Sequence, residues 1–535
     1  MIKAKIKKLI KDIVKKEAHL EHPANSEFGD YSTNMALQAK VDPQKIIDKL
    51  KNNPLFEKVE KAGPGFINFT LSKKALQEEL TEVIKQEDDY GKLDLGKDKK
   101  VQVEFISANP TGPLTVGNAR GGPFGDVLAN VLKKAGFQVE KAFYVNDAGQ
   151  QIIALGHSIL KDKEAKYKGK YIDDLSNKIK EKDPHKAGQI AAKYIIKDLI
   201  QKTTDKLGIK YDEWIFESDL YQSKRVDKVL NFLKKKDLIY QKEGAAWFKS
   251  SKFGDQRDRV VVKKDGDKTY LAGDIALHNY KFEEKKFDKV INLWGADHHG
   301  DVPGLMAGVE AIGHKGKLKI ILHQFVTILE KGEAKRMSKR SGIYVYMDEL
   351  LDKVSPDAVR FFFLQKSLDT HLNFDMALAK EQSAKNPVYY VQYAHARICS
   401  ILRKVEESKL DLSSVTSEVR PLERDLKEVP THKVKPLSFS IQKGLTLSTA
   451  ELNLIRQLIK FPEIIEETAS DYQVQRLPYY SLELANHFHK FYEQCRVLDE
   501  KNKELSQARI ILVKATQIVL KNTLELMGIS APEKM

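Results

Sequence analysis

The sequence predicts an α/β protein whose central domain is built on an open parallel sheet, with an α+β domain before it and an all-α bundle after it. The main observation is a β-rich run, residues 101–107, that passes through a proline-rich turn into a helix. Further β-rich runs at residues 138–145 and 289–294 are each followed by polar residues. From about residue 386 onward the apolar residues keep a uniform helical spacing.

Size and charge narrow the class of protein. With 535 residues the chain is too long for a single hydrophobic core, so we expect several domains. Its 90 Lys and Arg against 75 Asp and Glu give a formal charge of +15, which favours a polyanionic partner, although a lysine-rich solvated surface would give the same count. Cys399 and Cys495 lie far apart without a CxxC context, which argues against disulfides and a cysteine zinc site.

The same reasoning gives an expected location. No apolar run reaches the roughly 18 residues that a membrane-spanning helix needs, and the lysine-rich first residues lack the apolar core of a signal peptide. We therefore expect a cytoplasmic protein without membrane contact.

Residues 1–90 have the pattern of a small α+β domain. Ile6, Ile10 and Ile13 give an amphipathic first helix, and residues 28–40 a turn that enters a second helix. Residues 59–71 predict a turn followed by an alternating edge strand. Nothing here carries catalytic chemistry, so we expect a binding or packing module.

The central domain, residues 91–385, opens with the strand-to-helix run. Pro110 and Pro113 cannot donate to a sheet ladder, so the strand must end in a turn. A helix then begins near Val116, and Gly117 and Gly121 keep its first turns bare. Such a helix start is suited to a nucleotide phosphate or base, although a glycine-rich turn without a ligand has the same pattern.

Polar residues follow two other predicted strands. Asn146 and Asp147 come after residues 138–145, and Asp297 and His298 come after residues 289–294. The carboxyl ends of parallel strands border the ligand crevice, so these are site candidates, although an Asn-Asp pair is more often only a turn. Between these strands, residues 151–251 are charged and predicted to form a helical insertion, and a strand signal returns at residues 258–263.

A basic loop is predicted further along the chain. Lys335, Arg336, Lys339 and Arg340 place four cations within six residues, on a segment too polar for a core. Their mutual repulsion would be relieved by an anion, which suggests a clamp on a polyphosphate during in-line displacement. A surface loop that binds nothing is the alternative.

Residues 386–535 predict a helical bundle. Its helices are expected at residues 388–404, 451–469, 482–498 and 504–527, with a loop-rich insertion near residues 407–443. We interpret its aromatic residues as bundle core more readily than as platforms for RNA bases.

Several motifs together resemble those of one family. TVGN at residues 115–118 and RMSK at residues 336–339 stand where class I aminoacyl-tRNA synthetases carry their HIGH and KMSK signatures. The surrounding words closely resemble bacterial arginyl-tRNA synthetases: NPTGPLTVGNARGGPFGD, YVNDAGQQI, TYLAGDIALHNY, GADHHG, SPDAVRFFFL and LMGISAPEKM. The resemblance implies a Rossmann-like catalytic domain, an N-terminal tRNA-binding domain containing FGDYSTNMAL and AGPGFINF, and a C-terminal anticodon-binding bundle.

The resemblance also implies a reaction and its partners. The carboxylate of L-arginine would attack the α-phosphate of ATP, and the arginyl group would pass from arginyl-adenylate to the 2′-hydroxyl of the terminal adenosine of tRNA(Arg). The family needs bound tRNA before it activates its amino acid. We expect a monomer, with ATP as substrate, Mg²⁺ as its companion ion and no protein-held metal.

Site residues are carried over by position. By similarity, Asn109 would hold the α-amino group of arginine, while Tyr270 and Asp274 would grip its guanidinium. The further arginine contacts would be Glu104 and His298. The ATP contacts would be Pro113, Gly117, Arg120, Asp297, His298, Met337 and Ser338. Tyr270 and Asp274 are four residues apart, which places them on one face if their segment is helical.

One departure from the family pattern concerns catalysis. The usual HIGH histidines are replaced by Thr115 and Asn118, which can donate hydrogen bonds but carry neither charge nor a transferable proton. Stabilisation of the transition state is then expected to come from Lys339, Arg336 and Mg²⁺. We expect Lys339 to make the largest single electrostatic contribution.

Three alternatives stay open on the sequence. Another synthetase, such as a cysteinyl or glutaminyl enzyme, is one, although cysteinyl enzymes use a zinc site for which this chain lacks cysteines. A nucleotidyltransferase that forms an adenylate without tRNA is the second. A non-catalytic RNA-binding paralogue is the third, and the missing HIGH histidines keep it open.

Overall fold

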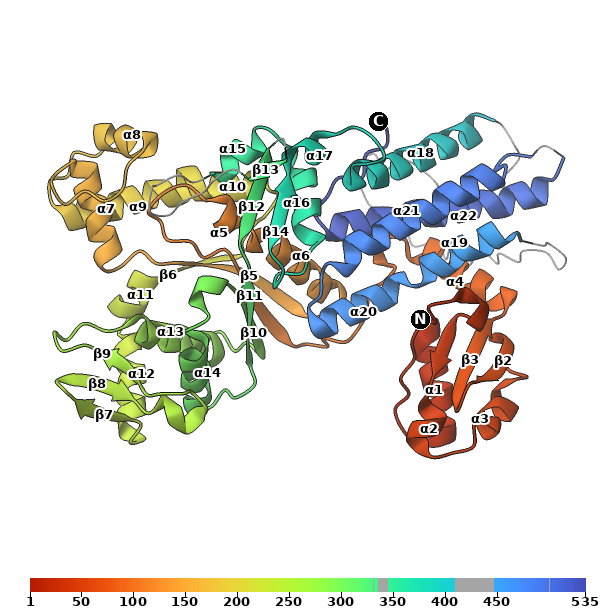
Figure 1. The fold of residues 1–535 in the computed structure, drawn as a ribbon, viewed down its shortest axis with the longest axis horizontal. Helices are drawn as coiled ribbons and strands as arrows, with labels where there is room; N and C mark the ends of the chain where they lie inside the picture. The colour runs from red at the N-terminus through yellow and green to blue at the C-terminus, as the bar shows by residue number, and fades with distance from the viewer. Residues whose placement is uncertain (331, 335–344, 409–446, 500) are drawn as a thin grey trace, which may run out of the picture.

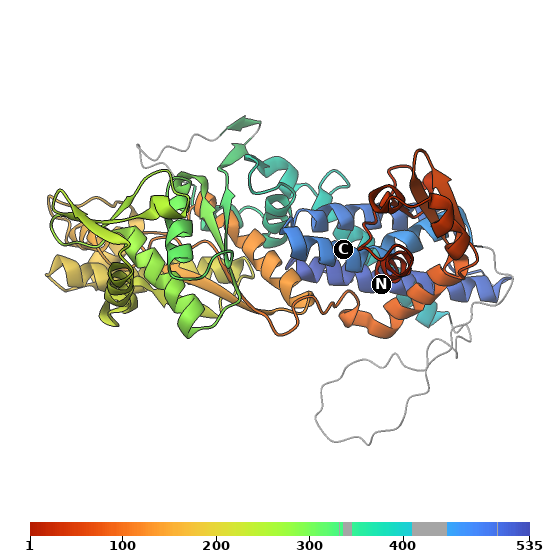
Figure 2. The same ribbon diagram turned by 90° about the horizontal axis from the view of Figure 1, so that it is seen from below.

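The computed structural model describes residues 1–330, 332–334, 345–408, 447–499 and 501–535. The molecule is elongated: the parallel sheet and its insertions lie at one end and the C-terminal helices at the other, with the N-terminal domain against those helices (Figure 1). The view from below shows the same order along the long axis (Figure 2). Among the described helices, none is long and apolar enough to cross a membrane.

The N-terminal domain combines a three-stranded antiparallel sheet with helices. The predicted first helix is confirmed, and its Ile6 and Ile10 are fully buried. The predicted edge strand is wrong, because it lies between the other two strands and buries Ile67 and Phe69. The elements are α1 (Ile2–Val14), β1 (Tyr31–Thr33), α2 (Met35–Ala39), α3 (Pro43–Leu50), β2 (Phe56–Ala62), β3 (Phe66–Leu71) and α4 (Lys73–Gln86).

The central domain is built on the predicted parallel sheet, which has five strands in the order β11-β10-β4-β5-β6. All neighbours pair in parallel. The chain leaves β4 toward β5 on one side and later adds β10 on the other, so the strand order reverses at β4 and opens a crevice at the carboxyl ends. The strands are β4 (Lys100–Glu104), β5 (Gln138–Val145), β6 (Glu213–Phe216), β10 (Lys289–Gly295) and β11 (Leu318–His323).

Helices cover both faces of this sheet. On one face α5 (Val116–Ala119) and α6 (Gly121–Lys134) follow β4, as predicted. A Cβ at Gly125 would lie 2.3 Å from the Phe105 ring, so only glycine lets α6 pack this closely on the end of β4. The other face packs against α13 (Tyr270–Asn279) and α14 (Val302–Ala311).

The predicted helical insertion contains strands as well as helices. Strand β6 lies inside residues 151–251 and joins the parallel sheet, and β7 (Ile239–Lys242) and β8 (Ala245–Phe248) pair with β9 (Arg259–Val262) in a separate antiparallel sheet. These strands are four residues long in charged surroundings, which hides their alternation. The helices are α7 (Gln150–Leu160), α8 (Lys170–Lys178), α9 (Pro184–Tyr194), α10 (Gln201–Lys206), α11 (Glu217–Gln222) and α12 (Arg225–Lys235).

A third small sheet and three helices lead out of the central domain. The sheet order is β13-β12-β14, and the predicted basic loop follows β13 and lies outside the described residues. The elements are β12 (Val326–Glu330), β13 (Glu333–Ala334), α15 (Met347–Leu351), α16 (Pro356–Leu364), β14 (Leu372–Asp375) and α17 (Met376–Lys380).

The C-terminal domain is the predicted helical bundle. The helix expected at residues 451–469 is in fact two helices, which meet at Lys460, just before Phe461 and Pro462 begin the second. Of the insertion expected near residues 407–443, residues 409–443 lie outside the described part of the chain. The helices are α18 (Pro387–Glu407), α19 (Thr449–Ile459), α20 (Phe461–Asp471), α21 (Arg476–Gln494) and α22 (Lys503–Leu526).

Buried charges join the bundle to the central domain. Arg360 of α16 is 1% exposed and ion-pairs with Asp126 of α6. Its Nε donates to the Met527 carbonyl at 2.7 Å and its Nη1 to the Leu207 carbonyl at 2.9 Å. A Cβ at Gly528 would lie 2.3 Å from this guanidinium, so the end of α22 is fitted to it. The helix that starts beside the crevice is thereby fixed to the end of the bundle.

Candidate functional site

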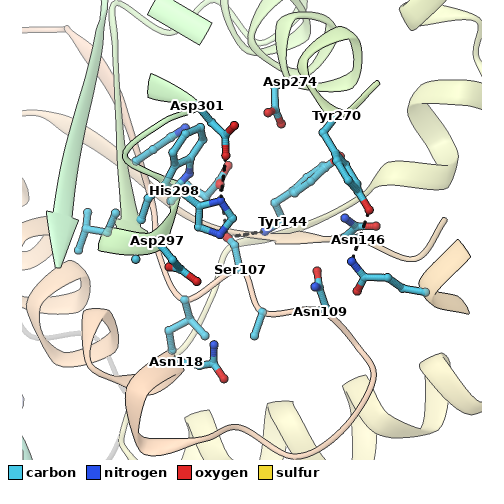
Figure 3. Close-up of a pocket in the computed structure, with 18 of the residues that line it drawn as sticks. Ser107, Asn109, Asn118, Tyr144, Asn146, Tyr270, Asp274, Asp297, His298 and Asp301 are labelled. Carbon is cyan, nitrogen blue, oxygen red and sulfur yellow. Dashed lines mark hydrogen bonds and ion pairs between the residues drawn. The ribbon is translucent and has the colours of Figure 1, made fainter. Parts of the chain in front are cut away.

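A cavity of about 820 Å³ opens at the carboxyl ends of β4, β5 and β10. This is the crevice expected where the strand order reverses. Among the described residues it brings together ten of the predicted site residues, several of which are labelled in Figure 3. They are Glu104, Asn109, Pro113, Thr115, Gly117, Asn118, Tyr270, Asp274, Asp297 and His298.

The start of α5 forms one part of this cavity. Thr115 caps the helix: its Oγ1 accepts from the Asn118 backbone N–H at 3.1 Å and donates to the Asn118 side-chain oxygen at 2.5 Å. A Cβ at Gly117 would meet only Thr115 Oγ1, at 3.8 Å, so the helix start is open toward the cavity. The two residues that replace the HIGH histidines therefore hold each other and order this helix start.

The segment that follows the basic loop lies against the same helix start. Val116 donates its N–H to the Val345 carbonyl at 3.0 Å, and Met347 donates to the Leu114 carbonyl at 2.8 Å. The predicted catalytic residues Lys339 and Arg336, with the predicted ATP contacts Met337 and Ser338, lie outside the described residues.

Arg120 lies away from the cavity, contrary to its predicted contact with ATP. Its side chain is fully buried, and its guanidinium donates to the carbonyls of Phe325, Ser367 and Thr370 at 3.1, 3.1 and 2.6 Å. Burial lowers its pKa to about 10, which still leaves the group charged near neutral pH. Arg120 therefore ties the α5–α6 junction to Phe325, just before β12, and to the loop that carries Ser367 and Thr370.

Asp297 and His298 lie at the end of β10, as predicted for polar residues after a parallel strand. Both are exposed, and Figure 3 shows them facing the cavity. The His298 Nδ1 lies 3.4 Å from Asp301 Oδ2, and its ring lies 5.9 Å from that of Trp294.

The opposite part of the cavity is acidic. The segment of Tyr270 and Asp274 is helical, which is the condition under which their four-residue spacing was expected to place them on one face, and both side chains line the cavity. Burial raises the pKa of Asp274 to about 8, with further contributions from the nearby carboxylates of Glu104 and Glu217. Tyr270 is 61% exposed, and its hydroxyl accepts from Gln151 Nε2 at 3.4 Å.

Glu217 is a cavity residue that the sequence analysis missed. It begins α11, directly after β6, and burial followed by the charge of Asp147 raises its pKa to about 7, while a hydrogen bond with Tyr144 opposes the rise. Asp147, a predicted candidate, accepts from the Ser218 N–H at 2.9 Å and hydroxyl at 2.7 Å, so it positions the helix that carries Glu217. The sequence offered one signal for Glu217: it is an acidic residue that directly follows a four-residue strand containing two aromatic residues.

Glu104 is a cavity carboxylate with a buried cationic partner. It pairs with Lys281, which is fully buried in the π-helical turn η5 (Tyr280–Glu284), and it accepts from Ser107 Oγ at 3.3 Å. The strand stops at Glu104, short of the predicted residue 107, because Ile106 and Ser107 have φ of 68° and 42°. A β-branched residue rarely adopts such φ, and backbone strain of this kind gathers at ligand sites.

The loop that carries Asn109 is held by the insertion. Tyr171 of α8 donates its hydroxyl to the Thr111 carbonyl at 2.9 Å. Asn109 is exposed to the cavity, and Figure 3 shows it on the same side as Asn146. The insertion thus fixes the wall between the helix start and the acidic part.

The cavity can therefore hold a molecule with a strongly cationic end beside one with phosphates. Among the described residues neither Asp274 nor Glu217 has an ion-pair partner, which favours a bound cation. At the helix start the N–H groups of Val116 and Asn118 are already bonded, so an anion there is favoured by the positive end of the helix dipole and by the open space beside Gly117. Within the described part of the chain, no group of three or more His, Cys, Asp or Glu side chains could hold a metal ion.

Family models match nearly the whole chain. Residues 1–71 match the arginyl tRNA synthetase N terminal domain, residues 79–189 and 162–373 the catalytic domain of class I (R) tRNA synthetases, and residues 391–535 the DALR anticodon binding domain. The Halalkalibacterium halodurans protein named arginine--tRNA ligase 1 is 40% identical over 97% of this chain and 94% of its own length.

Solved structures give the same likeness. A Campylobacter jejuni protein titled putative arginyl-tRNA synthetase is 32% identical, with a TM-score of 0.74, over 87% of this chain and all of its own. Thermus thermophilus arginyl-tRNA synthetase is 20% identical and covers both chains fully with a TM-score of 0.75, which shows a shared fold.

Proposed function

The chain belongs to the arginyl-tRNA synthetases of class I, and we propose that it is an arginine--tRNA ligase that uses ATP to join L-arginine to tRNA(Arg). The observation that carries this proposal is the cavity itself. It joins a bare helix start to a pair of carboxylates that have raised pKa values and, among the described residues, no ion-pair partner. A phosphate-bearing substrate and a guanidinium meet these two parts by charge.

Arginine is placed with its guanidinium between Asp274 and Glu217, beside Tyr270. A guanidinium offers donors in a planar fork that matches carboxylates, and its charge compensates both acids at once. We assign the amino-acid end of arginine to Asn109 and to the neighbourhood of Glu104. Lys281 already balances much of the charge of Glu104, so Glu217 takes the larger share of guanidinium binding.

ATP is placed along the other part of the cavity. Adenine fits over Gly117 near Pro113, the ribose near Asp297 and His298, and the phosphates toward the helix start that Thr115 and Asn118 order. Lys339 and Arg336 of the basic loop supply positive charge to the leaving pyrophosphate. Mg²⁺ prefers phosphate and water oxygens, so it would arrive with ATP and add charge compensation there.

The chain acts by positioning and electrostatics. Held in one cavity, a carboxylate oxygen of arginine attacks the α-phosphorus, and the bond to pyrophosphate breaks. The 2′-hydroxyl of the terminal adenosine then attacks the arginyl carbonyl, loses its proton and displaces AMP. Both steps develop negative charge that the helix start and the basic loop stabilise.

The C-terminal bundle offers a surface for tRNA bases. Tyr389 and Tyr393 of α18 stack with ring centroids 6.4 Å apart, and Tyr393 stacks on His489 of α21 at 6.2 Å. The Arg397 guanidinium lies 4.6 Å from the ring centroid of Tyr492. An aromatic and cationic surface of this kind stacks unpaired bases, so we assign anticodon contacts here and assign residues 1–90 to another part of the tRNA.

We further propose that the protein works as a cytoplasmic monomer.

The test is ATP–pyrophosphate exchange with each amino acid, with and without tRNA, together with charging of total tRNA. We expect pyrophosphate exchange with arginine and with no other amino acid, only when tRNA is present, and arginyl transfer to a single tRNA family. Exchange with a different amino acid would point to another synthetase, and adenylate formation without any transfer to a nucleotidyltransferase. No activity in either condition, with tRNA binding retained, would favour a non-catalytic RNA-binding protein.

A further inference from the structure

Asn292 of β10 lies on the floor of the acidic part of the cavity. It is 1% exposed, lines the cavity, and pairs in register with Glu104 on the neighbouring strand. No motif in the sequence drew attention to it, since it lies inside an apolar strand between Ile291 and Leu293.

His278 determines which way the Asn292 amide faces. The Nδ1 of His278 lies 2.7 Å from the Asp274 backbone carbonyl, which only accepts, so Nδ1 carries the proton. Burial, aided by the charge of Lys281, lowers the pKa of His278 to about 3, so the ring is neutral and its Nε2 accepts. The atom that lies 3.0 Å from Nε2 must therefore be the Asn292 nitrogen, a donor.

This arrangement leaves the Asn292 oxygen without a partner. Its Oδ1 is buried, and it has no hydrogen bond within the described part of the chain. Buried acceptors in native proteins are almost always satisfied, by the protein, by water or by a ligand. The position of Asn292 in the cavity wall makes a bound ligand the fitting partner.

The guanidinium of arginine has more N–H donors than two carboxylates in fork geometry can accept. A guanidinium has five N–H groups, and two carboxylates in fork geometry accept four of them. A fifth acceptor without charge would complete the site and add no repulsion between Asp274 and Glu217. We propose that Asn292 is a specificity-determining residue whose Oδ1 accepts a hydrogen bond from the guanidinium of arginine, and that His278 is the positioning residue that keeps this oxygen facing it.

This inference rests on the proposed arginine--tRNA ligase activity, and it adds a discrimination that charge alone lacks. A lysine ammonium has three donors and no planar fork, so it would leave the Asn292 oxygen or a carboxylate unsatisfied. A site that leaves a buried polar group unpaired rejects the wrong substrate strongly.

The experiment compares Asn292→Leu with a matched control, Gln102→Leu. Gln102 lies on the neighbouring strand β4, and its amide oxygen is also buried and unpartnered among the described residues, but it does not line the cavity. In Asn292→Leu we expect the KM for arginine in pyrophosphate exchange to rise about tenfold or more, with kcat and the KM for ATP within about threefold of the original. Gln102→Leu should leave the KM for arginine unchanged.

Butylguanidine identifies the end of arginine that Asn292 contacts. It keeps the guanidinium and lacks the amino and carboxyl groups, so its inhibition constant should rise in parallel with the KM for arginine. A rise in KM with an unchanged butylguanidine constant would overturn the guanidinium assignment. Equal effects of both leucine variants on the KM for arginine would also overturn the proposal, because they would indicate a structural role.

A measurement on the unaltered protein covers the case in which Asn292→Leu fails to fold. With asparagine labelled at its amide carbon, the Asn292 resonance should shift when butylguanidine is added, and an unmoved resonance would overturn the proposal. If the unaltered protein shows no arginine-dependent exchange at all, the proposed function fails instead. The inference about Asn292 fails on its own if exchange is present and the KM of Asn292→Leu stays within about twofold.

Discussion

The two parts of the cavity differ in whether their polar side chains already have partners within the protein. At the helix start, Thr115 and Asn118 already satisfy each other, and Gly117 leaves open space, so the part is ordered before anything binds. In the acidic part, burial raises the pKa of Asp274, with Glu104 and Glu217 nearby, and that of Glu217, with Asp147 nearby; neither carboxyl has an ion-pair partner among the described residues. One part is completed by the protein itself, and the other is completed only by its substrate.

This difference indicates which part of the cavity contributes more to the free energy of binding. Burying carboxylates without a partner costs free energy in the free protein, and a guanidinium recovers that cost when it binds. The helix start has no such deficit, so a nucleotide gains mainly from fit and from the helix dipole. Changes in the acidic part should therefore have larger effects than changes at the helix start.

The largest effect is expected from Asp274→Asn. The neutral amide keeps the shape but loses the charge that faces the guanidinium, so kcat/KM for arginine should fall about 100-fold or more. The measurement is arginine-dependent pyrophosphate exchange in the presence of tRNA, with the KM for ATP as control. An effect on ATP as large as that on arginine would mean that the two parts are not distinct.

The second prediction concerns pH. Both carboxyl pKa values are raised, to about 8 and about 7, so the free protein holds these protons at neutral pH. A guanidinium needs the ionised forms, so arginine affinity should rise about tenfold or more from pH 6 to pH 8.5 and level off above about pH 9. Calorimetry in two buffers of different ionisation enthalpy should detect proton release on binding.

The raised pKa values of Asp274 and Glu217 also determine whether the free energy of unfolding rises or falls with pH. An unfolded chain would release these protons near pH 4, so between about pH 4 and pH 8 the native state binds more protons. The contribution of these two carboxyls to the free energy of unfolding should therefore fall as pH rises toward 8, and arginine should reverse the fall. Equal thermal stabilisation by arginine at pH 6 and pH 8.5 would contradict the raised pKa values.

The third prediction is for the basic loop. Lys339→Ala should reduce pyrophosphate exchange at least about tenfold, because that lysine stabilises charge on the leaving group. Binding of butylguanidine, which has no phosphate, should be unchanged. A loss smaller than tenfold would remove Lys339 from its place as the main electrostatic contributor.

The fourth prediction pairs two glycines of the same strand-to-helix run. Gly117→Ala adds a methyl group where nothing lies closer than 3.8 Å, so folding should be unaffected while the KM for ATP rises about tenfold. Gly125→Ala would place its methyl group 2.3 Å from Phe105 and should lower the thermal midpoint by several degrees. A stable Gly117→Ala with normal ATP binding would remove Gly117 from the nucleotide site.

The smallest effect is expected from Thr115→Val. It preserves shape but removes the cap of α5, which costs about 1 kcal/mol in typical helices. We expect kcat to fall about threefold, with the KM for arginine unchanged, in steady-state exchange assays. A loss of a hundredfold would instead give Thr115 a direct part in catalysis.

The sequence alone predicted the parallel sheet and its strands β4, β5 and β10, whereas β6 was hidden in the predicted helical insertion. Short-range patterns were sufficient for β5, for α5 and α6, and for the polar residues at strand ends, because strand alternation and helix starts depend on neighbouring residues. Gly117 was predicted at a nucleotide site from the bare helix start, whereas Asn109 and Asp274 were assigned to the site only by the resemblance to a family. The four-residue spacing of Tyr270 and Asp274 placed both on one face on condition that their segment is helical, and the structure shows that helix.

Only the tertiary structure decided which polar side chains face the cavity and which form hydrogen bonds with other parts of the protein. Arg120 was a sequence candidate, yet three carbonyls from distant segments use its donors. Glu217 and Asn292 were missed, since their neighbours in the chain say nothing about the carboxylates and the histidine that meet them across the fold. Burial and pairing between residues far apart in sequence decide charge, protonation and hydrogen bonding, and no local pattern encodes them.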